Sequence, residues 1–216
     1  MSLDLTAYLR GVTRTVRNLE RDGQPAKAVI ASCIYETDAA DLWNALTDPA
    51  RIPRWFLPIS GELKLGGRYQ FQGNAGGTIT ECVPEKKIGA TWEYGGNVTW
   101  VTVTLTPEKT GTRFELEHVA IVGAHWGNFG AGAVGVGWEL GLLGLATHLR
   151  DPGAAIDPAT GAAWPTTPAG KDFVRASTTG WGHDDVAAGD PPEAARDRAE
   201  RTRQFYTGEA SPTTGT

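Results

Sequence analysis

The sequence predicts an α+β domain in which a curved antiparallel sheet wraps around one long helix. Three features support this fold class: an opening strand with a short helix, a run of short strands at hairpin spacing over residues 61–120, and a long apolar helix after them. Strands joined by short turns pair with their neighbours in an antiparallel meander. The long helix then has to bury its apolar side against one face of that meander.

Length and composition limit the class of protein. The chain of 216 residues is long enough for one sizeable core, or for one domain with an appended segment. Its formal net charge of −5 provides no basic surplus, so we expect no nucleic-acid partner. Two cysteines, Cys33 and Cys82, suit buried thiols in a reducing cytosol. No signal peptide and no stretch that spans a membrane are recognised, so we expect a cytoplasmic protein.

Residues 1–27 are predicted to form an N-terminal amphipathic helix that ends at Asp22-Gly23. The spacing of the apolar residues places Leu5, Leu9, Val12, Val16 and Leu19 on one side of it. Nearly opposite lie Arg10, Arg14, Arg17 and Arg21. Such a helix could lie on a membrane or bind a partner, and we favour docking on its own domain with the arginines in solvent.

The main domain is expected over residues 28–150. It opens with the strand AVIASCIYE, and the helix DAADLWNALTDP follows, with Thr37 or Asp38 as its N-cap and Pro49 at its end. Further strands alternate with turns: GELKLGGRYQF, GGTITECVP, KKIGATWEY, NVTWVTVTLTP and GTRFELEHVA. The long helix runs from about Gly132 to Arg150.

Residues 130–135, GAGAVG, fit the dinucleotide fingerprint G-x-G-x-x-G. The residues after the long helix form a Pro/Gly-rich loop rather than a second parallel strand, so no βαβ unit can close around a pyrophosphate. We therefore expect no nucleotide and no other cofactor.

The long helix also carries a row of glycines, Gly137, Gly141 and Gly144, with His148 beside it. Glycine inside a helix costs up to about 1 kcal/mol relative to alanine, so side chains there would obstruct something. Either the sheet or the tail approaches the helix closely, or the row leaves room for a ligand. Because this helix is apolar nearly all round and a sheet covers only one side, the tail or a second copy in a homodimer must cover the other.

Residues 151–216 are expected to form a helical extension packed on the domain. The segments TPAGKDFVRASTTGWGHDDVAAG and DPPEAARDRAERTRQFYTGE indicate two helices, the second with Asp190 as N-cap and Gly208 after its end. Residues 181–185, WGHDD, are interpreted as a solvent-exposed part of the first helix.

Five segments of the main domain carry a resemblance: LWNALTDPARIPRWF (residues 42–56), LKLGGRYQF (63–71), GTITECVPEKKIGATWEY (77–94), VTVTLTPEKTGTRFELEH (101–118) and GWELGLLGL (137–145). In this order they resemble the SRPBCC or START-like helix-grip superfamily, in the branch similar to activators of heat-shock-protein ATPase. The resemblance covers about Ala28 to Leu149. It implies a hydrophobic cavity between sheet and long helix, which different members use to bind lipids, polyketides, hormones or other apolar molecules. A fold alone does not fix function.

Alternation along the strands indicates which strand side chains point into such a cavity. The helical lid, the segment before the long helix and the glycine row of that helix are expected to supply the others. The predicted ligand-binding residues are Trp55, Phe56, Tyr69, Phe71, Trp92, Tyr94, His118, Trp126, Phe129, Gly141 and His148. Aromatic rings with few polar groups are typical of apolar ligand sites, and they also suit an ordinary core. The four histidines show no metal-ligand spacing, so we expect no metal.

The first functional hypothesis is therefore a binding module for a hydrophobic or amphipathic small molecule, oriented by His118 or His148. One alternative is a chaperone-associated or self-assembling interaction protein that uses the arginine side of the first helix. The other is a cyclase, aromatase or hydrolase with His118 as general acid or base.

Overall fold

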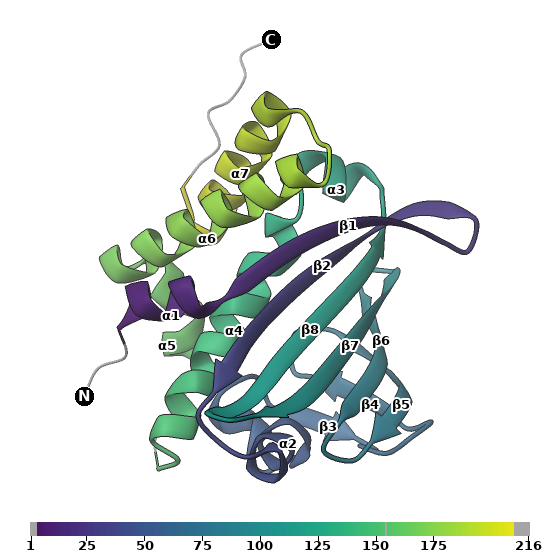
Figure 1. Cartoon of the computed structure of the whole chain (residues 1–216), viewed down its shortest axis with the longest axis vertical. Helices are drawn as coiled ribbons and strands as arrows, with labels where there is room; N and C mark the ends of the chain where they lie inside the picture. The colour runs from purple at the N-terminus through teal and green to yellow at the C-terminus, as the bar shows by residue number, and fades with distance from the viewer. Residues whose placement is uncertain (1–3, 154, 210–216) are drawn as a thin grey trace.

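The computed structural model describes residues 4–153 and 155–209. One antiparallel sheet, in the strand order β1-β2-β8-β7-β6-β5-β4-β3, curves around the long helix α4 (Figure 1). The strands are β1 (Thr13–Arg21), β2 (Gln24–Tyr35), β3 (Ile59–Gly61), β4 (Arg68–Phe71), β5 (Gly76–Val83), β6 (Lys87–Tyr94), β7 (Asn97–Glu108) and β8 (Gly111–Ile121). The helices are α1 (Leu5–Gly11), α2 (Ala39–Thr47), α3 (Ala124–Phe129), α4 (Gly132–Arg150), α5 (Pro158–Ala163), α6 (Pro168–Ala187) and α7 (Pro192–Thr207), with 3-10 turns η1 (Ile52–Arg54) and η2 (Trp164–Thr166). The predicted α+β helix-grip fold is confirmed.

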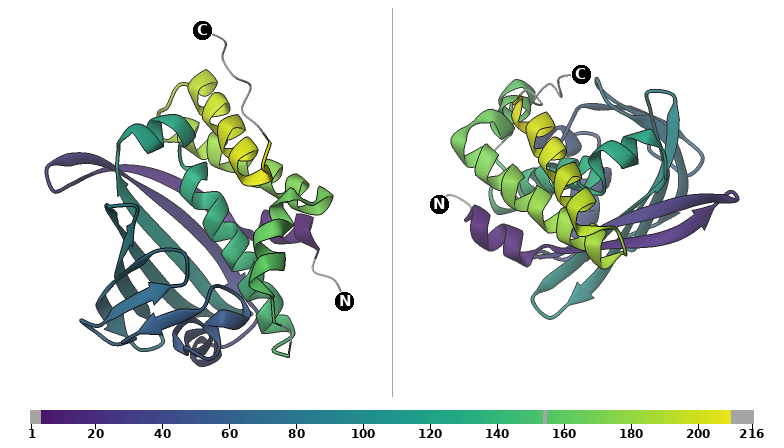
Figure 2. Two further views of the ribbon diagram at one scale, coloured as in Figure 1. Left: turned by 180° about the vertical axis from the view of Figure 1, so that it is seen from behind. Right: turned by 90° about the horizontal axis from the view of Figure 1, so that it is seen from above.

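The main core lies between the concave face of the sheet and α4 (Figure 2). Alternate residues of β2, among them Val29 and Tyr35, point into it and meet Leu142 and Leu145 of α4. Complete burial of such aliphatic side chains stabilises a fold by about 1.5–3 kcal/mol each. The Tyr35 hydroxyl also donates a hydrogen bond to the Leu142 carbonyl over 3.1 Å, which joins the middle of α4 to the sheet.

Residues 13–21 form strand β1, so the predicted helix is wrong beyond Gly11. β1 pairs with β2 along its whole length, and a tight turn at Asp22 and Gly23, with φ of 53° and 72°, joins the two strands. Asp-Gly favours this hairpin geometry because both positions require positive φ. The prediction failed because a spacing of four residues, as between Val12 and Val16, fits both the helical repeat and the strand repeat of two.

Of the arginines predicted to share one exposed helix face, Arg10 does lie in α1, whereas those of β1 are divided between the two faces of the sheet. Arg14 points inward, and its Nε lies 2.5 Å from Oε1 of the fully buried Glu139 of α4. Arg21 lies on the convex face, where its guanidinium stacks over the Trp100 ring at 3.9 Å. Arg17 pairs there with Glu117.

The C-terminal extension covers the side of α4 that faces away from the sheet, as the apolar circumference of this helix predicted (Figures 1 and 2). Trp181 of α6 is fully buried against α4 at Gly135, where an added Cβ would lie 2.2 Å from the indole ring. The Tyr206 hydroxyl of α7 donates to the Ala133 carbonyl over 2.9 Å. One chain thus supplies its own cover for α4. The division of the chain at residues 27 and 150 stays a prediction.

Two local expectations for the extension are wrong. Pro191, not Asp190, occupies the N-cap of α7, and the Asp190 carboxylate instead binds Lys27 over 2.8 Å and Arg198 over 2.5 Å. Residues 181–185 are not an exposed segment, because Trp181 and Asp185 are buried. Asp185 accepts a hydrogen bond from the Ala131 backbone N–H, where α4 begins. Gly208 does end α7, with a left-handed φ of 67°.

Close packing explains the glycine row on α4. An added Cβ would lie 2.8 Å from the Tyr206 hydroxyl at Gly137, 3.2 Å from the Phe56 ring at Gly141, and 2.4 Å from the Trp55 carbonyl oxygen at Gly144. Each glycine therefore admits a neighbour that a methyl group would displace. Among the described helices, none is long and apolar enough to cross a membrane.

Candidate functional site

A contiguous group of five aromatic rings lies between the concave face of the sheet and α4. We call it the aromatic cluster: Trp55, Phe56, Phe71, Trp92 and Trp138, all half-buried. The Phe56 and Phe71 centroids lie 5.0 Å apart, those of Phe71 and Trp92 5.7 Å, and those of Trp92 and Trp138 4.8 Å. Phe56 closes the group, at 5.6 Å from Trp55 and 6.4 Å from Trp138. None of the five residues is completely buried, so each keeps some surface that solvent can reach.

The local fold fixes the two rings that follow η1. The Trp55 indole donates to the Ala45 carbonyl of α2 over 2.9 Å, so this ring is held by the first helix of the main domain. Phe56 occupies the space that Gly141 leaves on α4. The strands supply the opposite wall, with Phe71 on β4 and Trp92 on β6.

His118 of β8 is buried beside the aromatic cluster and is fully hydrogen-bonded. Its Nδ1 accepts from the Trp138 indole over 2.9 Å, and its Nε2 lies 2.8 Å from the Thr99 hydroxyl. Because Nδ1 accepts, the proton of the neutral imidazole lies on Nε2 and is donated to Thr99. Thr99 in turn donates to the Trp92 carbonyl over 3.0 Å. Burial lowers the pKa of His118 to about 4, so the ring is neutral at physiological pH.

Tyr69 of β4 extends the aromatic cluster into the buried core. Its ring centroid lies 5.5 Å from that of Phe71, and its hydroxyl donates to the Thr91 carbonyl over 2.7 Å. Burial raises the pKa of this hydroxyl, so it stays protonated and keeps its hydrogen bond. Tyr69 therefore packs against Phe71, and its hydroxyl proton is not available to a ligand.

The structure thus brings together seven of the predicted site residues: Trp55, Phe56, Tyr69, Phe71, Trp92, His118 and Gly141. Tyr94 lies at the turn between β6 and β7 with 62% of its surface exposed, outside this enclosed group. Trp126 is buried in α3, with Lys27 Nζ 5.4 Å from its ring. Phe129 packs 5.8 Å from Phe205 of α7.

His148 is buried near the end of α4, where its Nε2 accepts from Arg51 Nε over 3.2 Å. Arg51 also donates to the Asp41 carboxylate over 2.7 Å, and this hydrogen bond lowers the pKa of Asp41. The histidine is thus part of a polar contact between α4 and α2. A role in ligand binding stays a prediction.

Sequence reasoning missed Trp138, which contacts Phe56 and Trp92 of the aromatic cluster and also His118. Its position three residues before Gly141, on the neighbouring part of the helix surface, was the available signal. The helical wheel assigned Trp138 to an apolar face of the helix, but it could not show whether that face packs in the core or lines a cavity.

Two hollows lie away from the aromatic cluster. A groove of about 630 Å³ lies between α6 and α7, with Arg175, His183 and Arg196 among its lining residues. A second, of about 510 Å³, is lined by residues at the start of α2 and the β7–β8 turn. Over residues 4–153 and 155–209, no group of three or more His, Cys, Asp or Glu side chains is placed to hold a metal ion.

Comparisons with known proteins agree with this architecture. The family model of Activator of Hsp90 ATPase homolog 1-like protein matches residues 36–150, a little over half of the chain. No curated protein matches this chain.

Among solved structures, the crystal structure of CalU16 from Micromonospora echinospora is similar at 28% identity and a TM-score of 0.65, covering 83% of this chain and 99% of that one. A match this long has to include segments outside residues 36–150. Protein MLL2253 from Mesorhizobium loti is similar at 24% identity and a TM-score of 0.52, covering 58% of this chain and 98% of that one. DynU16, described as a protein of the dynemicin biosynthetic locus, shares the fold at 20% identity and a TM-score of 0.51, covering 58% of this chain and 48% of its own.

The matched family residues, 36–150, include the whole aromatic cluster: Phe71 and Trp92 on the meander, Trp138 on α4, and Trp55 and Phe56 after η1. The chain belongs to the Activator of Hsp90 ATPase homolog 1-like protein family, within the SRPBCC superfamily.

Proposed function

We propose that this domain binds a hydrophobic or amphipathic small molecule against the aromatic cluster. The observation that carries the proposal is the half-burial of five touching rings, Trp55, Phe56, Phe71, Trp92 and Trp138. Three other aromatic residues, Trp181, Phe114 and Phe173, are by contrast almost completely buried. A contiguous apolar surface left open to solvent marks a binding site more often than a packing defect.

The polar groups near the aromatic cluster favour binding by apolar contact. His118 uses both ring nitrogens within the protein, and Tyr69 uses its hydroxyl proton. A ligand that displaced these bonds would leave buried donors or acceptors without partners, which costs about 1–3 kcal/mol each. We therefore expect His118 to orient Trp138 rather than the ligand, and shape and stacking to determine which molecules bind.

The same geometry weighs against His118 as a general acid or base. A general base needs a free lone pair within hydrogen-bond reach of the substrate. The Nδ1 lone pair of His118 accepts from Trp138, and Nε2 holds its proton toward Thr99. Proton transfer would first require Trp138 to leave. The cover of α4 by α6 and α7 likewise removes the reason to expect a homodimer on that side.

The test is a titration with anilinonaphthalene sulfonate (ANS), an amphipathic aromatic probe, followed by fluorescence. Trp92→Ala and Phe56→Ala should each weaken ANS binding about tenfold, since burial of one aromatic ring contributes roughly 1.5–3 kcal/mol. Trp100→Ala is the matched control. Trp100 lies opposite Thr91 on the neighbouring strand and packs on the convex face, so its loss should change the affinity by less than about twofold.

Circular dichroism and thermal melting of each variant establish that it is folded. Equal ANS affinity in wild type and both cluster variants would refute the proposal. Native mass spectrometry of freshly purified protein gives an independent reading, because a retained small molecule released by denaturation identifies the ligand class directly.

A further inference from the structure

The C-terminal helix α7 presents an aromatic surface beside the proposed ligand site. Phe205 has 69% of its surface exposed, the largest exposure among the large hydrophobic residues that the structure describes. Its ring lies 5.8 Å from Phe129 of α3 and 5.4 Å from Tyr206. An exposed phenylalanine that joins two further rings forms an apolar patch, where a lone one would be unremarkable.

The glycine row of α4 locates this patch relative to the aromatic cluster. Gly137 and Gly141 are four residues apart and therefore lie on the same side of the helix, about 6 Å apart along its axis. The Tyr206 hydroxyl fills the space over Gly137, and the Phe56 ring fills the space over Gly141. Tyr206 and Phe56 are thus neighbours along one side of α4. Of the three rings in the patch, Phe205 and Tyr206 lie beyond the residues that the family model matches.

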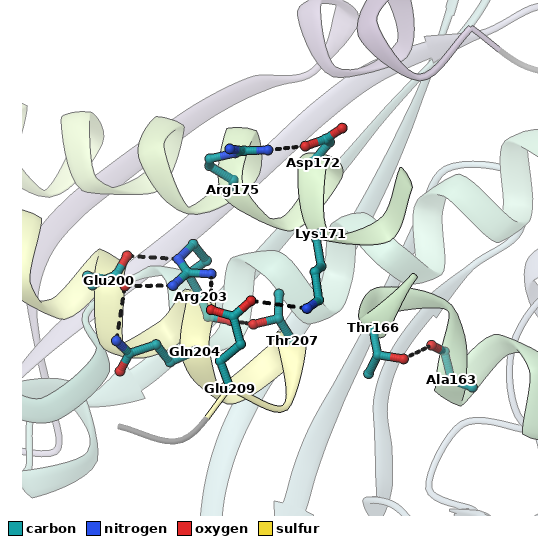
Figure 3. Close-up of polar contacts among 10 residues, drawn as sticks. All are labelled: Ala163, Thr166, Lys171, Asp172, Arg175, Glu200, Arg203, Gln204, Thr207 and Glu209. Atoms are coloured by element: carbon teal, nitrogen blue, oxygen red, sulfur yellow. Dashed lines mark hydrogen bonds and ion pairs between the residues drawn. The ribbon is translucent and has the colours of Figure 1, made fainter. Parts of the chain in front are cut away.

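Polar contacts hold the last turn of α7 in place, so the two aromatic residues there are preorganised. Figure 3 shows Arg203 between Glu200 and Glu209, with Lys171 of α6 bound to the same Glu209. These partners lower the pKa of Glu209, so the carboxylate stays charged at neutral pH. The Tyr206 hydroxyl adds its hydrogen bond to the Ala133 carbonyl of α4. A side chain held this way loses little further entropy when it contacts a ligand.

We propose that Phe205 and Tyr206 form an outer subsite of the ligand site, so that this chain selects elongated amphipathic molecules with more than one aromatic unit. One planar unit would lie against the aromatic cluster, and a second would stack on Phe205. Tyr206 would lie between them, with its hydroxyl kept on α4. This inference rests on the proposed function, and it assigns the C-terminal extension a part in specificity in addition to covering α4.

The experiment compares ANS with bis-ANS, its covalent dimer, on the full chain. ANS is short enough for the aromatic cluster alone, and bis-ANS carries a second naphthalene unit. Phe205→Ala should weaken bis-ANS binding about tenfold and change ANS binding by less than about twofold. Leu65→Ala is the matched control, because Leu65 is an apolar side chain with 63% exposure in the loop before β4. It should change neither affinity.

The outcomes of this experiment distinguish a failure of the outer subsite from a failure of the proposed function. If Phe205→Ala weakens neither probe while Trp92→Ala weakens both, the outer subsite is refuted and the proposed function stands. If Phe205→Ala weakens both probes equally, Phe205 is a general part of the site and the selection for length is refuted. If neither probe responds to Trp92→Ala, the proposed function fails and the subsite with it. Because Phe205 is exposed, its truncation should leave the melting temperature within about 2 °C of wild type, which separates binding from folding.

Discussion

Trp138 and His118 form a hydrogen-bonded pair at the centre of the candidate site, with the indole Nε1 2.9 Å from the imidazole Nδ1. The pair joins α4 to β8, and through Thr99 it also reaches the backbone of Trp92. A protonated His118 would carry hydrogen on both nitrogens and could no longer accept from Trp138. The orientation of this indole therefore depends on the neutral imidazole.

This dependence predicts a loss of stability in mild acid. Burial lowers the pKa of His118 to about 4, whereas a histidine in the unfolded chain titrates near 6.5. Between these values the unfolded state binds more protons, so the free energy of unfolding falls as the pH decreases. The contribution of His118 is complete above pH 6.5 and is lost progressively toward pH 4, with an upper limit of roughly 3 kcal/mol.

Urea unfolding at several pH values between 4.5 and 7 measures this effect. His118→Gln removes the titrating group, so we expect a flatter pH dependence than in wild type. His183→Gln replaces a solvent-exposed histidine of α6 and should keep the slope of the wild type. An unchanged slope in His118→Gln would assign the acid sensitivity to other groups.

The packing of the extension on α4 predicts an unfavourable Gly135→Ala substitution. In an exposed helix this change would stabilise by up to about 1 kcal/mol. Here the new Cβ would lie 2.2 Å from the buried Trp181 indole, so that ring or the helix that carries it has to move. Overpacking of this kind typically costs about 1–3 kcal/mol, and we expect a net loss in the free energy of unfolding.

Gly127→Ala supplies the control for the glycine prediction. Gly127 lies within α3, and an added Cβ there meets no atom within 4 Å. The alanine variant should be as stable as wild type or slightly more so, measured by the same denaturant titration. A Gly135→Ala variant that matched this control would show that α6 does not pack against α4 in solution.

The sequence predicted the main domain well, since its strands are short, alternate regularly and end at glycine-containing turns. Alternation also placed Trp92 and His118 correctly on the concave face. The reason is that β6 and β8 each pair with β7, which lies between them, without irregularity. It failed for Tyr94, which shares the parity of Trp92 but lies at the end of the strand, where the sheet no longer encloses it.

Residues that act between distant segments could not be predicted. The orientation of Trp138 depends on His118, 20 residues away and on another element. The error at β1 has a similar origin, because the Val12 and Val16 spacing is compatible with helix and strand, and only pairing with β2 decides between them. Local patterns specify which residues are apolar, but tertiary contacts determine which of two periodic structures buries them.

The Arg14–Glu139 ion pair gives the last prediction, and it concerns the connection between β1 and α4. Glu139 has no exposed surface, and the side chain of Arg14 is 13% exposed. The Arg14 guanidinium also lies 5.9 Å from the Trp181 ring of α6. The ion pair therefore lies where β1, α4 and α6 meet, and β1 and α6 are both outside the residues that the family model matches. Arg14→Met removes the positive partner and leaves a carboxylate in a buried site, which should lower the free energy of unfolding by about 3–5 kcal/mol.

The double variant Arg14→Met, Glu139→Met tests whether the loss comes from the unpaired charge. A buried ion pair can be replaced by apolar residues of similar volume with little effect, because both desolvation penalties disappear together. We therefore expect the double variant to recover most of the stability that Arg14→Met loses, measured as a double-mutant cycle by urea unfolding. If the stability losses of the two single variants simply add in the double variant, Arg14 and Glu139 are not directly coupled. The packing of Val12 and Val16 would then hold β1 on α4.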